Sequence, residues 1–215
     1  MSVGPSVEDY LKRILELSQV KGTATTSDLS EVLSLSAATV SVMLKRLKLM
    51  NLVHYQPYQG CSLTDEGRRI ALKLLRSHRI LECFLIAYLG YTWEDVDAEA
   101  ERLEHALSDR VVNRMEEMLG FPKRDPHGAP IPDRDLHYDF VLLTPLVKAP
   151  AGRSFVIEQV SSREPAALKS LRAFGLGPGT ACRLLDVTRE TLHLEIAGRP
   201  RTIPAHLASS LLVRA

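Results

Sequence analysis

The sequence predicts an α+β protein whose helices come first and whose strands come last. Apolar residues recur at helical spacing over most of residues 6–119. A short alternating segment, "LVHYQPYQGCSLT", interrupts them and contains Pro57 and Gly60, as a β-hairpin would. From about residue 152 the pattern changes to short apolar or alternating runs between Gly and Pro residues. These runs indicate a small β-barrel of roughly sixty residues.

Length and composition limit the classes of protein to consider. At roughly 100–150 residues per domain, 215 residues make one or two domains, with room for a small third module. No apolar run approaches the roughly 18–20 residues of a membrane span, and the N-terminus "MSVGPSVEDYLKR" has no secretory-signal pattern. The three cysteines are far apart in the sequence. We therefore expect a cytoplasmic protein with reduced thiols.

Local signals predict where the first helices begin and end. A helix over 6–20 should end at Gly22, and a second helix follows in "TTSDLSEVLSL". Ser36 is the expected N-cap of a third helix, and Thr64 can cap a long helix that Gly90 ends. A second helical block is expected at about 94–119.

Helix, tight turn, helix and hairpin at residues 6–64 form the layout of a winged helix-turn-helix. The second helix of the pair, about 37–49, would enter the major groove, where small side chains reach base edges and cations meet phosphates. No acid occurs between Glu31 and Asp65. The expected DNA contacts are Thr26, Ser36, Ala37, Ala38, Thr39, Ser41, Lys45, Arg46, Lys48 and Tyr58. The alternative is a three-helix core whose polar face serves protein contacts, with Tyr58 packing within the wing.

The second helical block carries the residues that indicate a metal site. At α-helical spacing, four side chains would share one face: Asp97, Glu101, Glu104 and His105. His78 and Glu82 have the same spacing on the preceding helix. Carboxylates and imidazoles without thiolate suit Mn²⁺ or Fe²⁺ better than structural Zn²⁺. The alternatives are a solvated acidic face, or catalytic carboxylates in a helical bundle.

A proline-rich segment, "FPKRDPHGAPIPDRD", follows the helices. Its four prolines predict an extended linker or a loop wrapped on the surface. Three regions result: a DNA-binding domain over 1–74, a helical metal-binding and dimerisation domain with this linker over 75–140, and the β-domain over 150–215.

Several motifs together resemble one family. "VEDYLKRILEL", "SAATVSVMLKRL", "LTDEGRRIA", "SHRILECFL" and "AERLEHALSD" are similar to segments of the DtxR/MntR metal-dependent transcriptional repressors. The segment "VIEQVSSREPAALKSLRAFGLGPGT" looks like the start of the SH3-like, or FeoA-like, domain of the longer members. The resemblance covers most of the chain and implies a homodimer that binds a double-stranded DNA operator when a divalent ion is bound.

The resemblance also implies a ligand set. It places metal ligands at Asp9, His78, Glu101, Glu104 and His105, with Glu82 and Asp97 at or near an ancillary site. Iron-responsive members carry Met and Cys at the positions of Asp9 and Glu101. Because Mn²⁺ is harder and prefers oxygen, the expected cofactor is Mn²⁺, with Fe²⁺ as the alternative. Lys12 stands where short manganese regulators carry a Glu, which puts a two-metal cluster in doubt. Further ligands from the C-terminal domain, in the region of Glu158, Gln159 and Glu164, stay open.

Two other classes remain as alternatives to a manganese-dependent or iron-dependent repressor. A metal-dependent enzyme on the helical block is not expected, because the sequence has no Gly-rich phosphate loop, nucleophile elbow or HExxH motif. A peptide-binding barrel would need clustered aromatics, yet residues 152–215 contain only Phe155 and Phe174. The segment "ILECFLIAYLGY" has more apolar surface than its own helix needs, which favours a dimer interface.

Overall fold

The computed structural model describes residues 3–214, which form two compact units interleaved along the chain. Unit 1 contains residues up to His78, the short stretch Glu104–Leu107 and Pro132–Leu142. Unit 2 contains Arg79–Leu103, Ser108–Ile131 and the chain from Leu143 onward. Among the described residues, none of the helices combines the length and apolar character of a membrane crossing.

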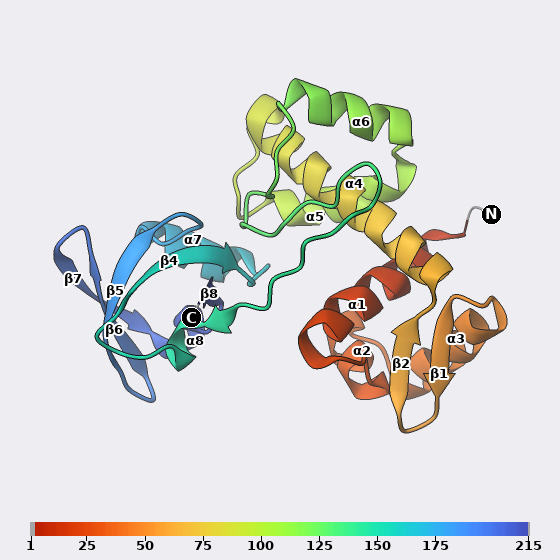
Figure 1. Ribbon diagram of the computed structural model, residues 1–215, viewed down its shortest axis with the longest axis horizontal. Coiled ribbons are helices and arrows are strands. Elements are labelled where there is room, and N and C mark those ends of the chain that lie inside the picture. The colour runs from red at the N-terminus through yellow and green to blue at the C-terminus, as the bar shows by residue number, and fades with distance from the viewer. Residues whose placement is uncertain (1–2, 215) are drawn as a thin grey trace. The chain divides into compact units, whose positions relative to one another are not determined.

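Unit 1 is a winged helix-turn-helix (Figure 1). Its elements are α1 (Pro5–Lys21), α2 (Thr26–Leu33), α3 (Ala37–Leu49), the hairpin β1 (Val53–Gln56) and β2 (Gly60–Leu63), and the first half of α4 (Asp65–Leu89). Side chains from all three small helices meet in the core, among them the fully buried Leu11, Leu29 and Leu44. This burial supplies most of the stability of such short helices.

Local caps determine where these helices begin and end. Ser36 accepts the backbone N–H of Thr39 at 3.1 Å, and Thr64 accepts that of Gly67 at 3.1 Å, so both predicted caps are confirmed. Gly22 ends α1 as expected. Thr25 and Asp28 form a reciprocal capping box at the start of α2, which satisfies two backbone donors.

The second helical block differs from the prediction. The chain forms α5 (Val96–Leu103), a 3₁₀ turn over Glu104–Ala106, and α6 (Asp109–Met118). Ser108 has an extended backbone and caps α6, so one continuous helix cannot pass through it. Asp97 and Glu101 lie on α5, so the α-helix that carries the predicted face ends just before Glu104 and His105. Glu104 and His105 lie on the 3₁₀ turn, which belongs to unit 1.

Unit 2 contains a six-stranded antiparallel sheet with the order β3-β8-β4-β5-β6-β7 (Figure 1, blue end). The strands are β3 (Thr144–Pro145), β4 (Ser154–Val160), β5 (Ala181–Val187), β6 (Thr191–Ile196), β7 (Arg199–Pro204) and β8 (Leu211–Val213). Bulges interrupt β4 and β5, and α7 (Pro165–Ala173) and α8 (Ala205–Ala208) complete the domain together with a 3₁₀ turn at Leu146–Lys148. Ile157 and Leu184 from the sheet share a core with Leu168 of α7. The predicted α+β class and SH3-like sheet are confirmed.

The proline-rich segment is more deeply packed than a surface linker. Asp125, His127 and Ala129 are buried, and the backbone N–H of Val160 on β4 donates to the carbonyl of His127 at 2.8 Å. Gly128 has a φ of +90°, and a Cβ there would lie 2.1 Å from the carbonyl oxygen of Glu158. Only glycine permits this backbone conformation and close approach. The middle of the loop, residues 125–129, is thus packed against β4 of unit 2.

Candidate metal centre and DNA interface

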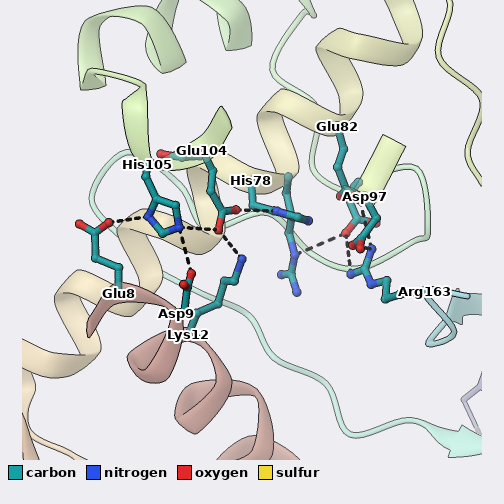
Figure 2. A network of polar contacts seen from close by, with 12 residues as sticks. Glu8, Asp9, Lys12, His78, Glu82, Asp97, Glu104, His105 and Arg163 are labelled. Atoms are coloured by element: carbon teal, nitrogen blue, oxygen red, sulfur yellow. Dashed lines mark hydrogen bonds and ion pairs between the residues drawn. The ribbon is translucent and has the colours of Figure 1, made fainter. Parts of the chain in front are cut away.

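A cluster of metal-binding side chains lies between α1 and the 3₁₀ turn of unit 1 (Figure 2). Asp9 comes from α1, and Glu104 and His105 come from the turn. Each offers one donor atom, and these atoms lie within 4.8 Å of one another. His105 Nε2 is 2.9 Å from Asp9 Oδ1 and 3.8 Å from Glu104 Oε1. Two carboxylates and one imidazole nitrogen therefore converge on one point.

Glu8 orients the imidazole of His105. Its Oε2 lies 2.7 Å from His105 Nδ1, on the side of the ring opposite to Asp9 (Figure 2). A carboxylate on one ring nitrogen holds the proton there and directs the lone pair of the other nitrogen outward, as in most protein sites where histidine binds a metal. With the proton held by Glu8, Nε2 would be available to bind a metal ion. The sequence analysis missed Glu8, although its position next to Asp9 was an available signal.

Glu104 is completely enclosed and has two further partners. Its Oε1 is 2.5 Å from the ammonium of Lys12, and its Oε2 is 2.6 Å from Nδ1 of His78. The side chains of Lys12 and Glu104 are 1% and 0% exposed. An ammonium has no lone pair while it is charged, so Lys12 supplies positive charge to this carboxylate but no ligand. His78, a predicted ligand, contacts the other carboxylate oxygen of Glu104, Oε2, and not Oε1, which faces His105.

The chemistry of the cluster fits a divalent ion that prefers oxygen and nitrogen. Burial raises the pKa of the Cys61 thiol to about 12, and burial with the nearby Asp125 and Glu82 carboxylates raises that of Cys83 to about 12. Burial also raises the pKa of Cys182. None of the candidate metal-binding groups among the described residues contains a cysteine. Oxygen and nitrogen donors thus define the character of the centre.

The remaining predicted ligands lie in unit 2. Glu101 is half-buried on α5, three residues before Glu104 in the chain. Glu82 on α4 and Asp97 on α5 both contact the guanidinium of Arg163, at 3.1 Å and 3.3 Å (Figure 2). Of the C-terminal candidates, Glu158 pairs with Arg124 at 3.1 Å. Arg163 gave no signal in the sequence analysis.

Most of the residues predicted to contact DNA are exposed on α3. Ala37, Ala38 and Thr39 are exposed at its start, and Lys45 and Arg46 are exposed further along. Val42, which is 69% exposed, adds an apolar side chain to the same helix. The hydroxyl of Ser36 accepts the backbone N–H of Thr39, and the hydroxyl of Ser41 donates to the backbone carbonyl of Ala37. Small, apolar and basic groups are therefore left for contact with DNA.

The wing carries one more of the predicted residues, Tyr58, and is contacted by another, Lys48 of α3. Tyr58 is fully exposed at the tip of the hairpin, where it adopts a positive φ of 67°. Such complete exposure excludes the alternative that it packs within the wing. Lys48 donates to the carbonyl of Tyr55 at 3.1 Å, which ties the end of α3 to the wing. Thr26 is half-buried at the first position of α2, directly after the N-cap Thr25.

Comparison with protein families gives three consecutive matches along the chain. Residues 2–61 match the iron dependent repressor N-terminal DNA binding domain, and residues 64–133 match the iron dependent repressor metal binding and dimerisation domain. Residues 144–215 match the FeoA domain. The chain belongs to the DtxR/MntR family of metal-dependent transcriptional regulators. It is a metal-responsive DNA-binding regulator with a dimerisation domain.

Named members of the DtxR/MntR family show how far the similarity extends. MntR of Geobacillus kaustophilus is 34% identical over 121 residues, which cover 56% of this chain and 85% of MntR. IdeR of Mycobacterium tuberculosis is 35% identical over 127 residues, which are 59% of this chain and about half, 55%, of IdeR. A solved manganese-dependent transcriptional repressor in complex with manganese matches 97% of this chain and 99% of its own, with 33% identity and a TM-score of 0.90. Both manganese and iron regulators are thus among its relatives.

Proposed function

We propose that this chain is a manganese-dependent repressor, and that its regulatory ion binds to Asp9, Glu104 and His105, with His78 held against Glu104 beside them. The observation that carries the proposal is the convergence of Asp9, Glu104 and Nε2 of His105 on one point, with Nδ1 of His105 occupied by Glu8. Carboxylate-rich sites suit Mn²⁺, and the solved relative in complex with manganese agrees with this choice.

Lys12 limits the centre to one ion per chain. Its ammonium already lies 2.5 Å from Glu104 Oε1, inside the cluster and out of contact with water. A second dication would meet the positive charges of both Lys12 and the first ion at close range, which costs several kcal/mol even at a protein dielectric of about 20. We therefore expect a single bound Mn²⁺, with Lys12 neutralising part of the carboxylate charge.

The bound ion would act on the DNA-binding helices through α1. Asp9 lies on α1, whose Leu11 and Ile14 are in the same core as Leu44 and Leu47 of the recognition helix α3. Without metal, the carboxylates of Glu8, Asp9 and Glu104 surround His105 and repel one another. A dication cancels this repulsion and joins α1 to the 3₁₀ turn. A coupling of about 1–3 kcal/mol would change the affinity for the operator by about 5–150-fold.

The assembly we propose is a cytoplasmic homodimer on a double-stranded operator. Apolar side chains are exposed on α4 and α6, where Tyr88 is 50%, Leu89 61% and Met118 48% exposed. These residues lie in the segment matched by the dimerisation domain. Buried in a dimer, they would contribute roughly 25 cal/mol for each Å² removed from water. A two-fold dimer would present two α3 helices to successive major grooves.

The test compares the metal-dependent DNA binding of the His105→Ala variant with that of a matched control variant, His206→Ala. His206 is exposed on α8, so its loss should leave metal binding unchanged. Operator DNA is first selected from a random pool with the wild-type protein and Mn²⁺, and binding is then followed by fluorescence anisotropy as Mn²⁺ is added. We expect the wild type and His206→Ala to respond and His105→Ala to remain a folded dimer without response. A full response by His105→Ala would refute the assigned centre.

Iron is the second candidate, because IdeR proteins are among the relatives of this chain. Anaerobic calorimetry of chelator-treated protein with Mn²⁺ and with Fe²⁺ separates the two. Tighter binding of Mn²⁺, at one ion per chain, is the expected result. A clear preference for Fe²⁺ would retain the family and the centre but overturn the choice of metal.

A further inference from the structure

A second cluster of acidic and imidazole side chains lies in unit 2, around the guanidinium of Arg163. Nη1 of Arg163 is 3.1 Å from Glu82 Oε1, 3.3 Å from Asp97 Oδ1 and 2.9 Å from Nδ1 of His127. Its Nη2 lies 4.0 Å from Asp125 Oδ2. The side chains of Glu82, Asp125 and His127 are 0% exposed. Arg163 reaches them from the segment between β4 and α7.

The protonation of His127 follows from its neighbours. A guanidinium can only donate hydrogen bonds, so Nδ1 of His127 accepts from Arg163 and carries a lone pair. Nε2 of the same ring carries the proton and donates to the carbonyl of Trp93 at 2.9 Å. A ring nitrogen that donates to a backbone carbonyl is how proteins hold a metal-binding histidine. The lone pair of Nδ1 therefore faces the centre of the cluster.

Asp125 is held in a similar way. Its Oδ1 accepts the backbone N–H groups of His127 at 2.8 Å and Ala129 at 2.9 Å. Its Oδ2 accepts no hydrogen bond and faces the cluster, 3.4 Å from Nε of Arg79. The loop that carries both residues is anchored to β4 by the close approach at Gly128. The donor groups are thus fixed by the backbone before any ion binds.

The donors of this cluster have the geometry of a metal site. Glu82, Asp125 and His127 each offer one donor atom within 4.8 Å of the others. Nη1 of Arg163 lies within hydrogen-bond distance of Glu82 and His127, which is the place a dication would take. An arginine is always charged at physiological pH, so it occupies this place permanently. The ancillary metal site expected near Glu82 and Asp97 therefore does not fit this chain as it stands.

We infer that the guanidinium of Arg163 is a permanent positive charge at the centre of this second cluster. It replaces a divalent ion there and ties the segment before α7 to α4 and α5 at any metal concentration. Only the centre at His105 then responds to metal, and the C-terminal domain stays attached when metal is scarce. The role of Arg163 concerns different residues from the proposed function, and only the statement about the centre at His105 rests on that proposal.

The test removes the guanidinium and measures whether a metal site appears. The background variant is His105→Ala, so that the first centre does not bind the added ion. Within it, Arg163→Ala is compared with Arg172→Ala by calorimetry of chelator-treated protein with Mn²⁺ alone. Arg172 is a matched control, because it also forms an ion pair from the C-terminal domain, with Glu94 at 2.9 Å, away from the cluster.

We expect Arg163→Ala to gain one Mn²⁺ per chain, bound at least tenfold more tightly than by the parent or by Arg172→Ala. Arg163→Lys should keep a cation and gain no ion, and His127→Ala added to Arg163→Ala should abolish the gain. No gain in a folded Arg163→Ala protein would overturn the inference, as would an equal Mn²⁺ site in the parent. If Arg163→Ala is unfolded without metal, its refolding on addition of Mn²⁺ supports the inference, and failure to refold overturns it.

Discussion

The buried pair of Lys12 and Glu104 allows a quantitative prediction for Lys12→Met. Methionine retains the apolar stem but removes the charge, so the Glu104 carboxylate would stay buried beside His78 without its ammonium partner. Breaking a fully buried ion pair in this way costs about 3–5 kcal/mol. The His78 contact at 2.6 Å remains, which favours the lower end of that range. We expect the free energy of unfolding of the metal-free protein to fall by about 3 kcal/mol.

The assay is urea unfolding of chelator-treated protein, at equal protein concentrations because dimerisation contributes to stability. Lys45→Met is the control, since Lys45 is exposed on α3 and its replacement should change stability by no more than about 0.5 kcal/mol. Lys12→Met combined with Glu104→Gln removes both charges and should recover about 2 kcal/mol. A loss below about 1 kcal/mol for Lys12→Met would refute the view that Lys12 is the counter-ion of Glu104.

Three further predictions test other parts of the structure. Gly128→Ala should destabilise the protein by roughly 2–3 kcal/mol in urea unfolding, because its Cβ would meet the Glu158 carbonyl, whereas Gly4→Ala has open space and should be neutral. Hydrogen bonds from Lys21 and Thr25 lower the pKa of Asp28 from 3.8 to about 2. The stability that Asp28 contributes is therefore present above pH 4 and lost as the pH falls towards 2. Asp28→Asn should flatten that part of the pH–stability curve. An unchanged curve would contradict the role given to the Asp28 hydrogen bonds. Leu89→Asp should yield monomers in light scattering, and an intact dimer would place the interface elsewhere.

Elements determined by neighbouring residues were predictable from the sequence. The capping hydroxyls of Ser36 and Thr64 act on backbone groups three residues away, and Gly22 acts at the end of its own helix. The order of helices, hairpin and late strands follows from the same local patterns. The helical block predicted at 94–119 is present, but it is divided into two α-helices and a 3₁₀ turn, because Ser108 caps a new helix.

The candidate site was predictable only in part. Helical spacing indicated Glu104 and His105, but Asp9 joined them only through the resemblance to family motifs, since no spacing within the sequence connects residue 9 with residue 105. The roles of Glu8 and Lys12 depend on contacts across more than ninety residues, with His105 and Glu104 respectively. Such contacts exist only after the chain has folded.

The sequence by itself determined the α+β class, the winged helix-turn-helix and the set of oxygen and nitrogen donors, because periodicity, caps and residue chemistry are local properties. Tertiary structure alone decided which charges share a buried volume. It placed the ammonium of Lys12 against Glu104 and the guanidinium of Arg163 between Glu82 and His127. Inside a protein such charges are costly unless paired, so their positions follow from the packing of distant segments rather than from the residues beside them.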